Sequence, residues 1–301
     1  MTERLSGVII PTVTPFDEDE SVSVGMMEAN FARWQETDVT GYMVLGSNGE
    51  FRSLDDDESV LVVEHAVRLS AGKTLIVGVG RESLRQTMRF ISRLEPLHHG
   101  IDYLSVLTPS YFRGLMTPAA LEAYFTAVAD ASPLPLLLYV APGFANQVTL
   151  PPSSLRSLAD HPNIHGVKDT NPSMIVDYTV AVGGRDDFSI LAGSLGNTLT
   201  NLALGGRGAV VSAANYLPDQ CAAVTGLYLS GRQNEARERY LTLQRLVRST
   251  AGPHGVAGLK LCMDAQGYRG GLPRLPVRPV EAATADDIRA ALARGTDRTA
   301  G

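Results

Sequence analysis

The chain has 301 residues, of which 44% are hydrophobic and 19% are charged, and its formal net charge at pH 7 is −6. This acidic balance argues against nucleic acid as the main partner, because phosphate binding requires a basic patch. No apolar run approaches the roughly 18 to 20 residues of a membrane span, and Met1 to Leu5 lack the basic start of a secretory signal, so we expect a cytoplasmic protein.

Eight short segments rich in β-branched and apolar residues recur along the chain. Most are apolar throughout rather than alternating, which is typical of strands buried on both faces of a parallel sheet. The expected strands are Gly7–Pro11, Gly41–Leu45, Thr74–Val79, Tyr103–Leu107, Leu136–Val140, Ile164–Lys168, Phe188–Ala192 and Gly208–Ser212.

Longer segments with helical spacing of apolar residues separate and follow these strands. The expected helices are 25–35, 55–70, 83–97, 117–131, 151–159, 173–182, 197–204, 217–230, 233–248, 256–266 and 283–293. The acidic run Asp55 to Glu58 is interpreted as an N-cap with first-turn carboxylates rather than as a metal site.

The alternation of strands and helices predicts an α/β fold, a (β/α)8 TIM barrel. We assign the catalytic barrel to residues 1–225 and a C-terminal helical region to residues 226–301. A doubly wound open sheet is the alternative, and it is weaker because no Gly-x-Gly-x-x-Gly motif follows the first strand.

Lys168 is one of only three lysines among the 26 basic residues, and it ends the sixth expected strand. A lysine that is desolvated loses its proton more easily and becomes an amine nucleophile, whereas arginine stays charged. Tyr139 ends the preceding strand, and neighbouring strands lie about 4.8 Å apart, so the phenol and the amine can touch. This pair predicts Schiff-base chemistry. The structural alternative is a lysine that pairs with Asp169 or another carboxylate at the barrel rim, next to a core tyrosine whose hydroxyl is satisfied.

Loops after other expected strands add small and polar residues at the same end of the barrel, where active sites occur. The glycines that flank Ser47 and Asn48 expose backbone N–H groups, and such a nest binds carboxylates or phosphates. A plain turn before a helix would have the same composition. Gly193 and Ser194, after the seventh strand, permit close approach of a substrate. The six histidines show no metal-binding spacing, so we expect no metal site.

Nearly the whole chain resembles the dihydrodipicolinate synthase / N-acetylneuraminate lyase family. The resemblance is carried by three motifs, Gly46-Ser47-Asn48-Gly49-Glu50, Tyr139-Val140-Ala141-Pro142 and Gly166-Val167-Lys168-Asp169. It implies a (β/α)8 barrel with a C-terminal helical region, a class I lyase that acts on pyruvate or another 2-oxo acid without a cofactor, and a homotetramer built from dimers.

The resemblance also implies roles for individual residues. Lys168 matches the imine-forming lysine, and Tyr139 matches the tyrosine that relays protons. The remaining matches are Tyr111 as the relay tyrosine that reaches a neighbouring subunit's site, Ser47 and Asn48 as the binders of the 2-oxo acid carboxylate, and Gly193 and Val210 as lining of the pyruvyl pocket.

Two departures bear on the substrate. Dihydrodipicolinate synthases place an arginine two residues after the proline of the tyrosine motif, to bind a second carboxylate, and here that position is Phe144. A carboxylate that meets an apolar ring would be unpaired, so synthase activity is disfavoured. Ser47-Asn48 is similar to the 4-hydroxy-2-oxoglutarate aldolase branch. Thr170 stands where that branch has a serine beside the active lysine.

We therefore expect a carbon–carbon lyase that cleaves a 4-hydroxy-2-oxo acid, with 4-hydroxy-2-oxoglutarate as the best candidate, to pyruvate and glyoxylate. An aldolase or dehydratase of a 2-keto-3-deoxy sugar acid is the first alternative, and a condensation of the dihydrodipicolinate synthase type is the second. A non-catalytic 2-oxo acid binder is the least favoured, because Lys168, Tyr139 and Tyr111 occur together.

Overall fold

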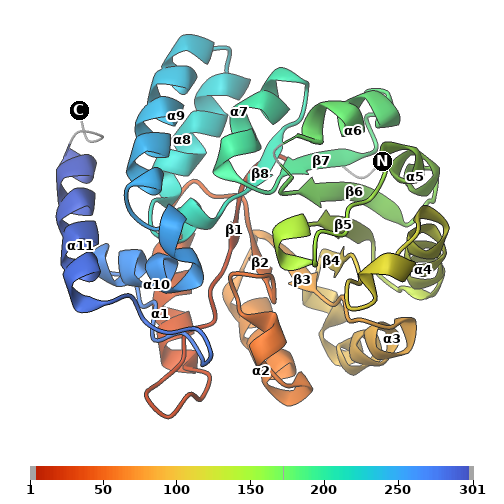
Figure 1. Cartoon of the computed structure of the whole chain (residues 1–301), viewed down its shortest axis with the longest axis horizontal. Helices are drawn as coiled ribbons and strands as arrows, with labels where there is room; N and C mark the ends of the chain where they lie inside the picture. Colours follow the sequence, from red (N-terminus) through yellow and green to blue (C-terminus); the bar gives the residue numbers. More distant parts are fainter. Residues whose placement is uncertain (1–4, 172, 298–301) are drawn as a thin grey trace. The chain divides into compact units, whose positions relative to one another are not determined.

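The computed structural model describes residues 5–171 and 173–297. Its strands form a closed barrel in chain order, β1 to β8, with helices between them (Figure 1). The predicted (β/α)8 TIM barrel is therefore confirmed. The strands are β1 (Gly7–Pro11), β2 (Gly41–Val44), β3 (Thr74–Gly78), β4 (Tyr103–Leu107), β5 (Leu136–Val140), β6 (Ile164–Asp169), β7 (Ser189–Ala192) and β8 (Gly208–Val210).

The helices follow the expected segments closely, with two exceptions. The last helix extends to Asp297, past its expected end at residue 293. Residues 83–97 were expected to form one helix, but α3 ends at Arg93 and a 3₁₀ helix, Glu95–Gly100, follows it. Pro96 explains the break, because proline lacks the N–H that an α-helix interior requires. The helices are α1 (Val24–Gln35), α2 (Asp56–Leu69), α3 (Leu84–Arg93), α4 (Pro118–Ala131), α5 (Pro152–Ala159), α6 (Ile175–Val182), α7 (Leu195–Ala203), α8 (Pro218–Leu229), α9 (Gln233–Arg248), α10 (Gly255–Ala265) and α11 (Ala282–Asp297).

The chain divides into two compact units. The first unit comprises Met1–Ser6 and Thr74–Val210, and the second unit comprises Gly7–Lys73 and Val211–Gly301. The expected assignment of residues 1–225 to a catalytic barrel and of 226–301 to a helical region stays a prediction.

In the first unit, β3 to β8 pair in parallel, and the β5–β6 register shifts between Leu136 and Leu137. The register aligns Leu107, Tyr139, Lys168 and Leu191 across β4, β5, β6 and β7. Every residue of β4 and β5 is buried, as expected for strands covered on both faces. The burial of β4 and β5 that the apolar sequence pattern predicted is therefore confirmed. The register places Lys168 and Tyr139 opposite each other.

In the second unit, Trp34, Tyr42 and Tyr268 form an aromatic cluster. The ring of Trp34 stacks near Tyr268 with ring centroids 5.9 Å apart and lies 6.1 Å from Tyr42. Its indole N–H donates to the carbonyl of Asn215 (3.1 Å), and the Asn215 amide donates to the carbonyl of Pro11 (2.9 Å). These bonds join the end of β1 to the segment that follows β8.

The acidic run at the start of α2 is a cap, as the sequence indicated. The Asp55 carboxylate accepts a hydrogen bond from the Glu58 backbone N–H (2.8 Å), and the Glu58 carboxylate accepts one from the Asp55 backbone N–H (3.1 Å). This reciprocal capping box satisfies two N–H groups that the first turn would otherwise leave unpaired.

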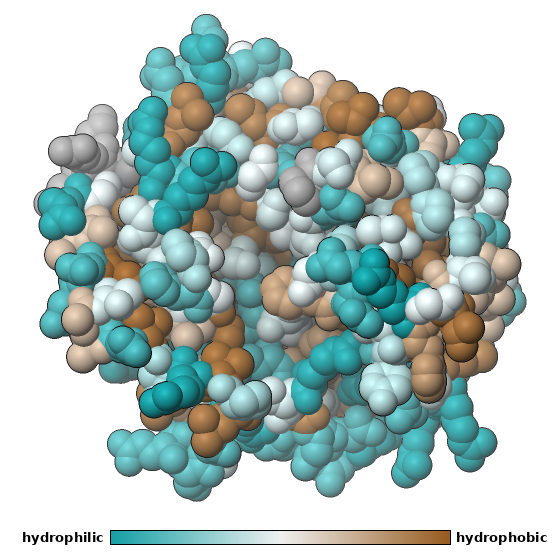
Figure 2. Space-filling model, viewed as in Figure 1, coloured by the Kyte–Doolittle hydropathy of each residue, from teal (hydrophilic) through white to brown (hydrophobic). Residues whose placement is uncertain are grey.

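Hydrophilic and apolar residues are interspersed on the face shown in Figure 2, where the apolar ones form small groups rather than one continuous patch. Within residues 5–171 and 173–297, no helix combines the length and apolar character needed to cross a membrane.

Gly166, in the middle of β6, leaves no room for a side chain. A Cβ at this position would collide with the carbonyl oxygen of Ser189 on β7 and would lie 3.1 Å from the Leu137 side chain. We therefore expect Gly166→Ala to lower the free energy of unfolding in urea by about 1 to 3 kcal/mol, as overpacked cores do.

Gly226 is the matched control, because it is exposed in α8 and an added Cβ there meets nothing within 4 Å. Gly226→Ala is expected to raise the free energy of unfolding by about 0.5 to 1 kcal/mol, since glycine weakens a helix interior. A Gly166→Ala variant as stable as the unsubstituted protein would contradict the packing described here.

Candidate active site

Lys168 and Tyr139 lie side by side at the C-terminal ends of β6 and β5, two strands that are neighbours in Figure 1. The Lys168 Nζ is 4.0 Å from the centroid of the Tyr139 ring. Both side chains are 4% exposed. The sequence predicted this contact from the matching positions of the two residues on consecutive strands.

Burial controls the protonation of Lys168. Desolvation lowers the pKa of its amine from the ordinary value of 10.5 to about 7, because a charged ammonium is disfavoured away from water. The lowered pKa favours the neutral amine, which is the form that attacks a carbonyl carbon.

Asp169, the next residue, is directed elsewhere. Its carboxylate accepts a hydrogen bond from the backbone N–H of Asn171 (2.9 Å), and burial raises its pKa to about 7. Side chains of successive strand residues point to opposite faces. The geometry therefore favours the nucleophile over the alternative of a lysine paired with Asp169.

Thr170 and Gly193 form a closely packed rim beside Lys168. The N–H and the hydroxyl of Thr170 both donate to the carbonyl of Val140 (3.0 and 3.3 Å). The Gly193 N–H donates to the carbonyl of Asp169 (2.6 Å), and a Cβ on Gly193 would lie 2.7 Å from that oxygen. Only glycine fits this close approach of β7 to the end of β6.

Ser194 and Val210 occupy the ends of two further elements of the first unit. Ser194 is the N-cap residue of α7, and its carbonyl accepts a hydrogen bond from the Thr198 hydroxyl (3.2 Å). Val210 is the last residue of β8 and is 1% exposed. Their predicted contact with a substrate stays a prediction.

Tyr111 belongs to the loop after β4 and is 76% exposed. The Glu82 carboxylate, which follows β3, accepts hydrogen bonds from the backbone N–H groups of Ser110 (2.7 Å) and Tyr111 (2.8 Å). On the other side of the loop, the Asn146 amide donates to the Ser110 carbonyl (3.2 Å). The backbone of Tyr111 is therefore fixed, although its ring projects outward against Phe112.

Glu82 and Asn146 were not among the residues predicted from the sequence. Glu82 could have been found from its place just after β3, at the face where barrel loops carry function. Asn146 has a φ of 48°, a left-handed conformation that asparagine tolerates better than most residues.

Phe144 ends a 3₁₀ helix, Pro142–Phe144, directly after β5. The residue is 59% exposed, and its backbone N–H donates to the carbonyl of Ala141 (2.9 Å). An apolar ring thus stands next to the strand that carries Tyr139.

Ser47 and Asn48 lie in the second unit, in the turn after β2. The Gly49 N–H donates to the Gly46 carbonyl (3.1 Å), and the Asn48 side-chain amide donates to the Ser212 hydroxyl (2.7 Å). Because the Ser212 oxygen accepts this bond, its own proton is left to donate. Ser212 was missed at the sequence level and adds a donor to the turn.

The chain was compared with known proteins, and residues 4–294 match the Dihydrodipicolinate synthetase family. Over 292 residues, it is 36% identical to a probable mitochondrial 4-hydroxy-2-oxoglutarate aldolase of Emericella nidulans, which covers 94% of this chain and 92% of that protein. Over 299 residues, it is 30% identical to an L-threo-3-deoxy-hexylosonate aldolase of Hypocrea jecorina, with 94% and 93% covered.

A solved structure agrees with these relatives. The chain superimposes on a prophage protein of the dihydrodipicolinic acid synthase family from E. coli K12, crystallised in complex with pyruvate, with a TM-score of 0.88. The two are 25% identical, and the match covers 97% of this chain and 98% of the other. The chain therefore belongs to the dihydrodipicolinate synthetase family and is a class I lyase or aldolase.

Proposed function

We propose that the protein cleaves a 4-hydroxy-2-oxo acid to pyruvate and an aldehyde, with 4-hydroxy-2-oxoglutarate as the substrate and glyoxylate as the aldehyde. The observation that carries the proposal is the buried Lys168 amine, with its Nζ 4.0 Å from the Tyr139 ring centroid and its pKa lowered to about 7. The 36% identity to a probable 4-hydroxy-2-oxoglutarate aldolase supports the choice of substrate.

In the first half of the reaction, the substrate carboxylate binds at Ser47 and Asn48, and the neutral Lys168 amine adds to C2. Tyr139 protonates the resulting hydroxyl, which leaves as water, and the product is a protonated imine. The ring face of Tyr139 stabilises the positive charge that develops beside it. Gly193, Ser194 and Val210 line the pyruvyl group in this proposal, and Thr170 lies beside the lysine.

In the second half, the Tyr139 phenolate takes the proton of the C4 hydroxyl as general base. The C3–C4 bond breaks, its electron pair moves toward the imine to form an enamine, and the aldehyde leaves. Tyr139 returns the proton to C3, and hydrolysis of the imine releases pyruvate and the free amine of Lys168. Tyr111 is the proposed relay that exchanges protons with solvent.

Phe144 favours cleavage over the synthase reaction. An apolar ring at this position offers no partner to a second carboxylate of an incoming semialdehyde, and an unpaired carboxylate is costly to desolvate. Cleavage or dehydration of a 2-keto-3-deoxy sugar acid is the second candidate, and the 30% identity to an L-threo-3-deoxy-hexylosonate aldolase favours it.

We also propose a homotetramer in which Tyr111 reaches the site of a neighbouring subunit. The exposure of Tyr111, Phe112 and Leu115 supports this proposal, because a neighbouring subunit would cover these apolar side chains. The cytoplasmic location stays a prediction.

Trapping of the imine tests the chemistry directly. Incubation with pyruvate and borohydride is expected to add the reduced pyruvyl group to Lys168, as mapped by mass spectrometry of peptides. Lys168→Ala should abolish the adduct while circular dichroism shows an intact fold. Lys73→Ala is the control, since Lys73 donates to the backbone carbonyls of Trp34 and Thr37 and should leave the adduct unchanged. An unlabelled Lys168 would refute the aldolase mechanism.

Pyruvate release from a panel of substrates tests the choice of aldehyde. We expect kcat/KM for 4-hydroxy-2-oxoglutarate to exceed that for 2-keto-3-deoxy sugar acids by at least about tenfold, the ratio that one differential interaction of 1.4 kcal/mol gives. Release of pyruvate from deoxy sugar acids alone would establish the second candidate instead.

A further inference from the structure

Lys260, on α10, is a second deeply buried lysine, and the proposed chemistry does not use it. It is 1% exposed, and its Nζ lies 2.6 Å from the Glu50 Oε1. Glu50 is itself 8% exposed and stands two residues after Asn48, at the end of the turn that is proposed to bind the substrate carboxylate.

The Lys260 ammonium contacts one carboxylate and two backbone carbonyls. It forms an ion pair with Glu50, donates to the backbone carbonyls of Thr14 (2.9 Å) and Leu272 (2.8 Å), and lies 4.4 Å from the centroid of the Phe16 ring. Burial lowers the pKa of Lys260, and the negative charge of Glu50 opposes this shift. The ion pair and the two hydrogen bonds together hold the Lys260 amine in one position.

Glu50 transmits this constraint to the turn. Its backbone N–H donates to the carbonyl of Ser47 (3.2 Å), and its φ of 50° is a left-handed conformation that costs energy for a residue other than glycine. Its second carboxylate oxygen accepts the backbone N–H of Arg274 (3.1 Å). Both carboxylate oxygens are thus held by the chain after residue 259, and the strained conformation is fixed.

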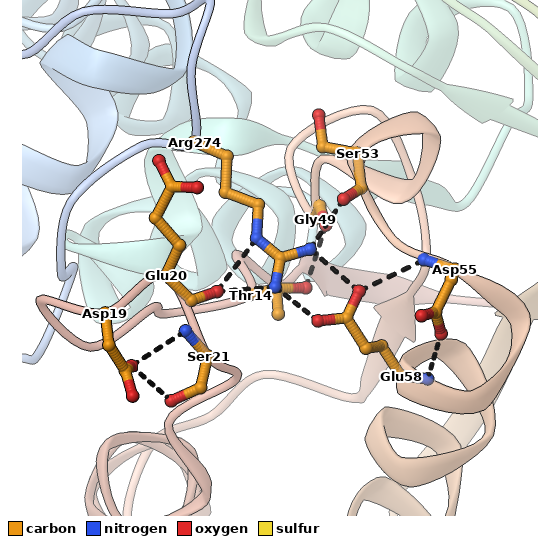
Figure 3. Close-up of polar contacts among 9 residues, drawn as sticks. All are labelled: Thr14, Asp19, Glu20, Ser21, Gly49, Ser53, Asp55, Glu58 and Arg274. Carbon is orange, nitrogen blue, oxygen red and sulfur yellow. Dashed lines mark hydrogen bonds and ion pairs between the residues drawn. The ribbon is translucent and has the colours of Figure 1, made fainter.

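Arg274 also contacts the residues that follow the turn, as Figure 3 shows. Its guanidinium forms an ion pair with Glu58 and donates to the carbonyl of Ser53 (2.6 Å). From the other side, the Thr14 hydroxyl donates to the carbonyl of Gly49 (2.8 Å). The segment from residue 49 to the first turn of α2 is therefore anchored at several points to the C-terminal segment and to the chain after β1.

We propose that the Glu50–Lys260 ion pair is a positioning device that holds the Ser47–Asn48 turn in the conformation that binds the substrate carboxylate. This inference rests on the proposed function, in which that turn receives the carboxylate. Backbone N–H groups bind an anion strongly only when they are already aimed at it, because a ligand that must order its own site binds less tightly. Without the ion pair, the turn would have to be ordered by each substrate molecule.

The carboxylate dependence of imine formation separates this role from a contribution to stability alone. We would titrate wild-type protein, Glu50→Gln and Lys260→Met with pyruvate and with pyruvamide, its uncharged analogue, in the presence of cyanoborohydride. Mass spectrometry of the Lys168 adduct gives the half-saturating concentration of each ketone. The ratio of the two concentrations is independent of the folded fraction, so a destabilised variant still gives a valid result.

Glu50→Gln and Lys260→Met are expected to raise the half-saturating concentration of pyruvate about tenfold, the size of one lost hydrogen bond to a charged group, and that of pyruvamide by less than about twofold. Lys73→Met is the matched control, because Lys73 lies in the same unit and donates to the carbonyls of Trp34 and Thr37. It should change neither value.

If both variants bound pyruvate and pyruvamide in the wild-type ratio, the positioning role would be refuted while the imine mechanism stood. If wild-type protein formed no Lys168 adduct with either ketone, the proposed function would fail and the positioning role with it. A ratio that shifts equally in Lys73→Met would also refute the proposal, because the effect would not be specific to the ion pair.

Discussion

Desolvation of one amine is the constraint on which the proposed chemistry depends. Lys168 is held on β6 between strands that are buried on both faces, so its ammonium form loses hydration and the pKa falls to about 7. Parallel register then sets the Tyr139 ring against it. Neither residue needs a flexible loop for this contact, because both belong to rigid strands. The fold therefore places the proposed nucleophile and the proposed proton carrier next to each other.

The two buried lysines show how environment decides what the same side chain does. Burial lowers the pKa of both amines, but the shift at Lys260 is opposed by the negative charge of Glu50, which lies 2.6 Å away. Lys260 is thereby suited to hold a turn, and Lys168 is suited to react. A lysine side chain suits both positions, because its amine is compact and its pKa shifts readily on burial, unlike that of arginine.

Much of the architecture could be predicted from the sequence because buried parallel strands are short and apolar, and because glycine and proline mark their ends. The contact of Lys168 with Tyr139 followed from two positions on consecutive strands. The end of α3 could not be predicted in this way, because the apolar spacing continues past Pro96 whereas the α-helix ends at Arg93. The apolar spacing thus predicts a helix or strand well only where no proline interrupts its backbone hydrogen bonds.

The contacts that hold the loops could not be predicted, because they join residues that are distant in the chain. Glu82 binds the backbone near Tyr111, and Lys260 binds Glu50 from more than two hundred residues away. A charged residue in a loop gives no sign of its partner until the fold is known. These contacts are where the structure adds most to the proposed site.

The pH dependence of imine formation tests the central claim most directly. If Lys168 reacts as a desolvated amine, the rate of pyruvate trapping by cyanoborohydride should rise with pH, with a midpoint near the pKa of about 7, and level off above it, since only the neutral amine adds to the ketone. A rate that keeps rising toward the ordinary lysine pKa of 10.5 would show that burial does not prepare Lys168 for attack, and it would contradict the account.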